Sequence, residues 1–182
     1  PDLRGQGKSE LGVGDGSLEQ QADDMAAVLD CMRVEKAVLA GHSMGGYLAL
    51  AFAERHPERL AALILVTSHT GADDEDKKQG RIRDAERIPY CGTREFAAGL
   101  APRLSNDADL VNRMQKIIAA TSPDGLANVL RAIAARPDRT ELFKQLDKPV
   151  MFIAGAQDQI VKVTTAKELH WAKPSLRMAI LP

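Results

Sequence analysis

The sequence has few aromatic residues and almost no excess charge. Phe, Trp and Tyr make up 4% of its 182 residues, and no basic stretch is interleaved with aromatic residues in the way that suggests stacking on nucleic-acid bases. The formal net charge is −1, which gives no general attraction to nucleic acid or to an anionic membrane. We therefore expect no nucleic-acid partner and no membrane association.

Long apolar runs and a cysteine framework are also absent. No run approaches the roughly 18 apolar residues of a membrane-spanning helix, and no signal peptide opens the sequence. The two cysteines, Cys31 and Cys91, are too few and too far apart for a disulfide framework or a zinc site. A catalytic thiol at Cys91 has little support, because no histidine neighbours it in a recognisable pattern. These features predict a reduced, cytoplasmic protein without metal or cofactor.

Apolar residues are nevertheless plentiful enough for a core. The sequence is 45% hydrophobic and 27% charged, which suits one globular domain with room for an insertion. Short apolar runs alternate with helical periodicity. The expected strands are 36–40, 60–67, 149–154 and 176–181, and the expected helices are 18–32, 47–55 and 164–171. This order predicts an α/β fold with a mostly parallel, doubly wound sheet. The run 60–67 is apolar enough for a strand covered on both faces.

The alternation breaks between residues 71 and 147, where no strong strand signal occurs. This block opens with a charge run, 73–78, that we expect to be solvated, and it continues with several amphipathic helices. Because the block interrupts an α/β core, we predict a helical lid inserted between two core strands. The alternative is a separate helical domain with no role in a pocket. The predicted domains are therefore a core of 1–70 and 148–182 and a lid of 71–147.

The stretch Gly41-His42-Ser43-Met44-Gly45 lies between an expected strand and an expected helix and has the form G-x-S-x-G. A serine on such a sharp turn takes a strained backbone conformation, and we expect both flanking glycines to be needed to avoid Cβ collisions. The hydroxyl would stand clear of the sheet at the positive end of a helix. The N–H of Met44 could then point at a developing oxyanion. We interpret the stretch as a nucleophile turn, and the alternative is a plain glycine-rich turn.

Three segments, taken in order, resemble the α/β-hydrolase superfamily. Residues 2–9 (DLRGQGKS) are similar to the loop after the fourth strand of that fold, and residues 41–46 (GHSMGG) to its nucleophile elbow. Residues 155–161 (GAQDQIV) are similar to the loop that carries its triad acid. The resemblance covers essentially the whole sequence, with the helical block in the usual place of the lid. It is nearest to small bacterial hydrolases that include esterases and enol-lactonases.

The resemblance assigns a role to each matching residue. Ser43 matches the nucleophile, and Asp158 matches the acid that orients the catalytic imidazole. The N–H of Met44 matches one donor of the oxyanion hole. For Asp158 the alternative is an ordinary turn residue. Arg4 matches a loop position near the pocket, but a structural role for it is at least as well supported.

Two parts of the family's machinery are not found in the sequence. The triad histidine usually follows the last core strand, but here the sequence stops at Pro182. The second oxyanion donor usually comes from a loop that would precede Pro1. A serine hydroxyl without a base is a poor nucleophile. We therefore expect the sequence to be an incomplete α/β hydrolase, truncated at both ends and inactive as written.

None of the four histidines is a convincing substitute for the missing base. His42 occupies the variable position of the elbow, and His56 and His170 fall at or within helices. His69 follows the strand next to the one that carries Ser43, so we expect it to line the pocket.

The function implied by this resemblance is hydrolysis of a small ester, lactone or related acyl substrate through an acyl-enzyme on Ser43. A serine at this position excludes the dehalogenase type, which needs aspartate. The alternatives are C–C bond hydrolysis, perhydrolysis or a lyase step on the same scaffold, or a non-catalytic member that binds a small ligand. The sequence leaves the substrate and the oligomeric state open.

Overall fold

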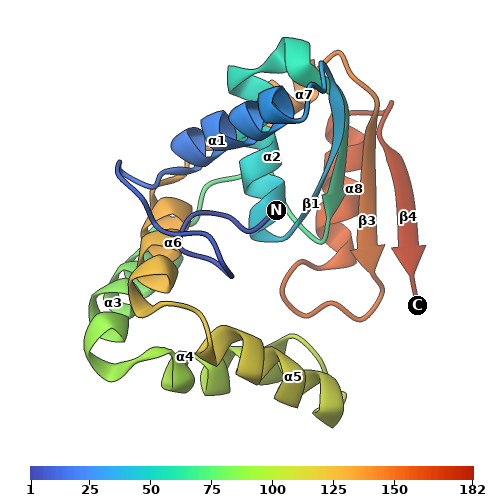
Figure 1. The fold of residues 1–182 in the computed structure, drawn as a ribbon. Coiled ribbons are helices and arrows are strands. Elements are labelled where there is room, and N and C mark those ends of the chain that lie inside the picture. Colours follow the sequence, from blue (N-terminus) through green and yellow to red (C-terminus); the bar gives the residue numbers. More distant parts are fainter. The chain divides into compact units, whose positions relative to one another are not determined.

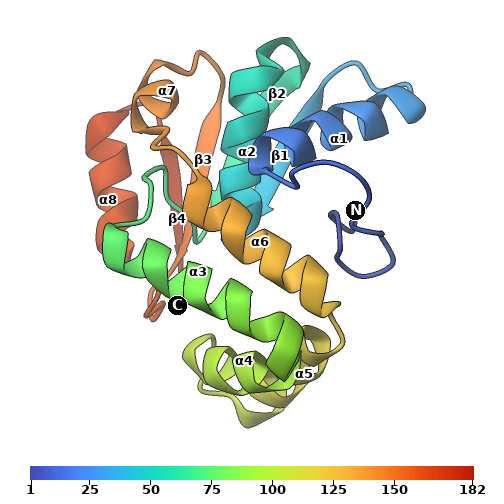
Figure 2. The same ribbon diagram turned by 90° about the vertical axis from the view of Figure 1, so that its left-hand side faces the viewer.

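The computed structural model describes residues 1–182 and divides them into two compact units. The sheet unit comprises residues 18–72 and 137–182, and the helical unit comprises residues 1–17 and 73–136. Figure 1 labels the α-helices and three of the strands, and Figure 2 also labels β2. The structure thus groups the first 17 residues with the inserted helices, and residues 137–147 with the sheet. That the insertion acts as a lid remains a prediction.

The sheet unit is built on four parallel strands in the order β1-β2-β3-β4. His42 lies opposite Val66, and Val66 lies opposite Ile153, so the carboxyl ends of the first three strands meet at one edge. This confirms the predicted α/β fold with a parallel sheet and a helical insertion between β2 and β3 (Figure 1). The strands are β1 (Ala37–His42), β2 (Leu60–Val66), β3 (Val150–Gly155) and β4 (Arg177–Leu181).

The helix that follows β1 is buried over most of its length. In α2 (Met44–Arg55) the residues from Gly46 to Ala53 are all buried. The side chains of α2 are small and apolar on nearly every side, so the helix can be buried without leaving polar side chains short of hydrogen-bond partners. The helix stops at His56 because a residue before proline is forced out of the helical region, and its φ of −132° shows this.

Three further helices complete the sheet unit: α1 (Leu18–Cys31), α7 (Thr140–Gln145) and α8 (Val163–Ala172). Helix α1 packs against α2, and α8 packs against β3 and β4. The guanidinium of Arg139 is only 3% exposed and joins two helices, because it pairs with Glu19 on α1 and with Glu54 on α2 at 2.8 Å. Since both acids are partly exposed, this cluster is only half removed from water.

The two faces of the sheet differ in burial. Leu63, Leu65 and Phe152 point to one face and are 0% exposed. On the other face Val38 is 56% exposed, and Ile64 is only partly buried. The apolar run of β2 led us to expect cover on both faces. Within residues 1–182 its side chains instead alternate between a buried and a half-open face.

The helical unit consists of two helix pairs (Figure 2). Helix α3 packs along α6, and their contact holds a small apolar core around Ala85, Ile88 and Leu130. Helix α4 pairs with α5, and the hydroxyl of Thr93 donates to the Ala119 carbonyl at 2.9 Å. The amphipathic helices expected from the sequence correspond to α4 (Thr93–Leu100), α5 (Ala108–Ala119) and α6 (Pro123–Ala135). Helix α3 (Glu75–Cys91), which includes most of the charge run 73–78, was not expected.

The charge run at the start of this unit is not simply solvated, as we had expected. The side chain of Asp73 is 2% exposed and pairs with Arg136 at 2.9 Å and with Arg81 at 2.5 Å. Burial by itself raises the pKa of Asp73, but hydrogen bonds from Arg136 and Arg81 outweigh it and lower the pKa from 3.8 to about 2. The partners lie 8 and 63 residues away, so local sequence gives no sign of this cluster.

Two further features of the structure concern apolar residues. No helix in residues 1–182 is both long and apolar enough to span a membrane. The single tryptophan, Trp171 on α8, is 86% exposed.

Candidate active site

Ser43 lies at the junction between β1 and α2 in a strained backbone conformation. Its φ is 51° and its ψ is −112°, a region that residues with a side chain rarely occupy. The conformation is held on both sides, because the Ser43 N–H donates to the Val66 carbonyl at 2.9 Å and the Gly46 N–H donates to the Ser43 carbonyl at 2.9 Å. The serine is thus fixed on a sharp turn between strand and helix, as the G-x-S-x-G pattern predicts.

The glycines around Ser43 are not equally constrained. A Cβ on Gly41 would lie 2.2 Å from the Gly45 carbonyl oxygen, so only glycine fits there. A Cβ on Gly45 would meet no atom within 4 Å. The expectation that both flanking glycines are needed is therefore right for Gly41 and wrong for Gly45. The second tight position is Gly46, where a Cβ would lie 2.3 Å from the Ser68 hydroxyl.

Ser68 is a supporting residue that sequence reasoning missed. It lies just past β2, is 0% exposed, and donates its hydroxyl hydrogen bond to the Ser43 carbonyl at 2.8 Å. The turn is thus pinned by β2 through the Val66 carbonyl and through this hydroxyl. A polar residue two positions after an apolar strand was the only available signal, and it does not reveal the partner.

Met44 is the first residue of α2. The first N–H groups of a helix have no acceptor within the helix, and they lie at its positive end. The Met44 N–H is therefore available to an anionic oxygen formed next to Ser43. No side chain caps this end of α2.

Asp158 lies in the loop after β3, and Ser43 follows β1. Because the strands are parallel with β2 between them, both residues emerge at the same edge of the sheet. The carboxylate oxygen Oδ1 of Asp158 accepts hydrogen bonds from the N–H groups of Ile160 at 2.7 Å and Val161 at 2.9 Å. These contacts orient the side chain within its own loop and leave the second oxygen available for another donor.

His69 is also at this edge, just past β2. Its Nε2 lies 3.0 Å from the Tyr47 hydroxyl, and the two rings meet edge to face at 5.1 Å. Nearby, the pKa of Asp138 lies below its usual value, chiefly because the Thr140 N–H donates to it, with a smaller contribution from His69. The imidazole of His69 is therefore held by Tyr47 and lies in the field of a carboxylate.

The other histidines have different surroundings. His56 Nε2 lies 2.8 Å from an Asp23 carboxylate oxygen, and His170 Nδ1 lies 3.0 Å from the Leu176 carbonyl. His42 is exposed at the end of β1, on the half-open face of the sheet.

Arg4 acts within the helical unit. Its guanidinium donates to the carbonyls of Leu11 at 3.1 Å and Val13 at 3.2 Å, and so closes the glycine-rich loop on itself. In the same unit, the backbone of Gly5 approaches α6 so closely that a Cβ on Gly125 would lie 2.0 Å from the Gly5 carbonyl oxygen. These contacts give Arg4 a structural role. Cys31 and Cys91 are exposed and unpaired, and no cluster of three or more His, Cys, Asp or Glu side chains could hold a metal ion.

Comparison with known proteins gives consistent matches. The family model described as the alpha/beta hydrolase fold matches residues 1–182. The chain is 29% identical over 174 residues to 3-oxoadipate enol-lactonase 2 of Acinetobacter baylyi, and the match covers 92% of this chain and 64% of that enzyme. It is 28% identical to a 2-hydroxy-6-oxononadienedioate/2-hydroxy-6-oxononatrienedioate hydrolase of Paraburkholderia phymatum, covering 96% of this chain and 64% of that one.

A comparison with solved structures agrees with these matches. A thermophilic esterase from Thermogutta terrifontis superimposes with a TM-score of 0.95 at 33% identity, covering all of this chain and 70% of that one. The chain thus spans about two thirds of the length of these relatives.

Proposed function

Because the chain belongs to the α/β-hydrolase fold family, we propose that Ser43 is the nucleophile of a hydrolase for small ester, lactone or related acyl substrates. The observation that carries the proposal is the strained turn of Ser43, held by Val66 and Ser68 at the start of α2. Strain of this kind persists only where the surroundings enforce it, and it is typical of reactive residues. The similarity to an enol-lactonase and to an esterase supports this substrate class.

In this mechanism the Ser43 hydroxyl attacks the acyl carbon, and the leaving alkoxide departs with a proton. The acyl-enzyme is then hydrolysed by water. The N–H of Met44 stabilises the oxyanion of each tetrahedral intermediate, and one such donor contributes about 10²–10³ in rate. Asp158 orients the imidazole that takes the serine proton and stabilises it as a cation.

The base in this scheme is an imidazole that reaches Ser43. His56, His69 and His170 each have a partner elsewhere, and His42 is exposed on the open sheet face. We propose that the polypeptide of residues 1–182 by itself acylates Ser43 only slowly, since loss of a triad member removes several orders of magnitude in rate.

The test is chemical rescue. The 182-residue protein is incubated with p-nitrophenyl acetate, with and without free imidazole, and acyl transfer to Ser43 is mapped by mass spectrometry. Imidazole should raise the rate of serine acylation well above that of imidazole-catalysed hydrolysis in solution. Ser43→Ala should remove the excess, and Ser17→Ala should leave it unchanged. Acylation at other serines alone, or rescue that survives Ser43→Ala, would contradict the proposal.

A second candidate is C–C bond hydrolysis, a perhydrolysis or a lyase step at the same serine. The similarity to the oxononadienedioate hydrolase favours hydrolysis among these three. A non-catalytic ligand-binding member is the third, and it is distinguished by a complete lack of acylation at Ser43 under rescue.

A further inference from the structure

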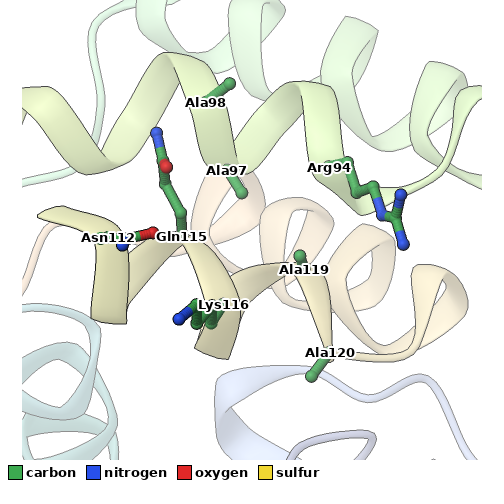
Figure 3. Close-up of a pocket in the computed structure, with 8 residues that line it drawn as sticks. All are labelled: Arg94, Ala97, Ala98, Asn112, Gln115, Lys116, Ala119 and Ala120. Atoms are coloured by element: carbon green, nitrogen blue, oxygen red, sulfur yellow. The ribbon is translucent and has the colours of Figure 1, made fainter.

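The helical unit contains a cleft of about 540 Å³ between α4 and α5. Figure 3 shows its lining: Arg94, Ala97 and Ala98 come from α4, and the remaining residues come from α5 and the residue after it. The volume lies within the range of small-molecule sites. Every lining residue belongs to the helical unit, so the cleft is a property of this unit alone.

The charges that line the cleft all have one sign. Arg94 and Lys116 supply two cations, and no carboxylate lines the cavity. Glu95, the acid next to Arg94 in sequence, is committed to Arg87 at 2.7 Å. The side chains of Arg94 and Lys116 take part in no ion pair or hydrogen bond within residues 1–182, whereas Arg81 and Arg136 of the same unit are both paired with Asp73.

The neutral side chains that line the cleft supply hydrogen-bond donors and a small apolar surface. Asn112 and Gln115 offer amide donors that have no partner in the protein, and in Figure 3 the Gln115 side chain extends from α5 toward α4. The rest of the lining is four alanines, whose methyl groups form a small apolar surface. In Figure 3 the methyl of Ala119 lies between Lys116 and Arg94, and the methyl of Ala97 projects from α4 above it.

We propose that this cleft binds a small organic anion, a carboxylate on a short aliphatic body. The anionic oxygens pair with Lys116 and accept from the amides of Asn112 and Gln115, the aliphatic part covers the alanines, and the positive charge of Arg94 beyond them adds to the attraction. Charge-assisted hydrogen bonds of this kind are about twice as strong as neutral ones. The proposal does not depend on Ser43 as a nucleophile, since it concerns binding in the other unit.

The first experiment is a titration of the ¹⁵N-labelled 182-residue protein with butyrate, followed by amide chemical shifts. Butyrate should shift the amides of α4 and α5, and neutral butyramide should bind at least about tenfold more weakly. Acetate, which has two fewer methylene groups to place on the alanines, should bind about tenfold more weakly than butyrate. Inorganic phosphate tests the alternative that the cations recognise any oxyanion, and phosphate binding as tight as that of butyrate would overturn the aliphatic part of the proposal.

The second experiment uses charge variants with a matched control. Lys116→Gln should weaken butyrate binding about tenfold, and Arg94→Gln should weaken it by a smaller factor. Arg113→Gln removes the same charge from α5 outside the cleft and should leave binding unchanged. Ser43→Ala should also leave it unchanged, which separates this proposal from that for the hydrolase. Equal shifts with butyrate and butyramide, or equal weakening by Arg113→Gln, would show that the cations are simply solvated.

Discussion

The two units of this chain differ in how deeply they bury a helix. In the sheet unit α2 is buried from Gly46 to Ala53, and Ser43 at its start is held by the Val66 carbonyl of β2 and by the Ser68 hydroxyl. In the helical unit α5 has no buried residue, and it is joined to α4 along one side. A buried helix leaves little room for change in its side chains, whereas an exposed one can vary its side chains at little cost to stability. The buried helix of the sheet unit is therefore suited to holding a reactive residue in one position. The exposed α4–α5 pair is suited to a binding surface whose side chains can change.

The charged clusters of the two units also differ in burial, but here the more buried cluster lies in the helical unit. In the helical unit, Asp73 and Arg136 are both 2% exposed. In the sheet unit, Arg139 is 3% exposed, but its partner Glu54 is 47% exposed. An ion pair stripped of water costs much more to break than one that water can reach. The helical unit thus combines a buried ion pair with the small apolar core between α3 and α6, whereas the ion pair of the sheet unit stays in contact with water.

The largest effect is expected at the Ser43 turn. Gly41→Ala places a Cβ 2.2 Å from the Gly45 carbonyl oxygen, and neither backbone can move without breaking the turn. We expect a loss of more than about 4 kcal/mol in the free energy of unfolding, measured by hydrogen exchange in peptides of the sheet unit. Gly45→Ala is the control and should cost less than about 1 kcal/mol, since its Cβ meets open space. Equal losses in the two variants would show that the turn is less rigid than its contacts imply.

The next largest effect belongs to the helical unit. Asp73→Asn leaves the buried guanidinium of Arg136 and the partly exposed guanidinium of Arg81 without their carboxylate, and we expect it to cost about 3 kcal/mol. Hydrogen exchange should speed up in α3 and α6 and stay unchanged in β1 and β2. Asp76→Asn removes the same charge from an exposed position of α3 and should have almost no effect. Loss of protection in both units would show that they unfold together.

The same carboxylate predicts a pH dependence. Its pKa is lower in the folded state, about 2, than its ordinary value of 3.8. The stabilisation is therefore fully present above about pH 4 and is lost as the pH falls toward 2, which amounts to about 2 kcal/mol. Acid titration followed by hydrogen exchange in α3 and α6 should show this loss, and Asp73→Asn should abolish it. Persistence of the acid transition in the variant would assign it to other carboxylates.

A smaller effect is expected at the charged cluster of the sheet unit. Arg139→Met removes the cation but leaves Glu19 and Glu54 in contact with water, so we expect a loss of about 1–2 kcal/mol. Urea unfolding followed by circular dichroism measures it. A loss as large as that of Asp73→Asn would remove the contrast between the two clusters.

The smallest expected effect is at the Tyr47–His69 pair. Tyr47→Phe removes one hydrogen bond of 3.0 Å and keeps the ring contact, so we expect a loss of about 1 kcal/mol. It should also free the His69 ring. An upfield or downfield change in the His69 ring protons, with the backbone unchanged, is the signature to look for, and unchanged ring signals would show that the bond is not formed in solution.

The comparison also explains which parts could be predicted from sequence. The turn at Ser43 and the four strands were predictable, because they depend on glycines and apolar runs that are contiguous in the chain. Ser68, Tyr47 and the partners of Asp73 were not, because each acts through a residue more than twenty positions away or through a side chain whose direction the pattern does not give. Gly45 was misjudged for the same reason, since its surroundings come from the fold and not from the motif.

The exposure of Trp171 decides how this protein can be observed. An indole that is already in water emits at much the same wavelength in the folded and the unfolded chain, so intrinsic fluorescence would barely register denaturation. The same property makes it a sensitive detector of the opposite event. Any molecule that settles on the outer side of α8 would dehydrate the ring and shift its emission to the blue, with no label attached.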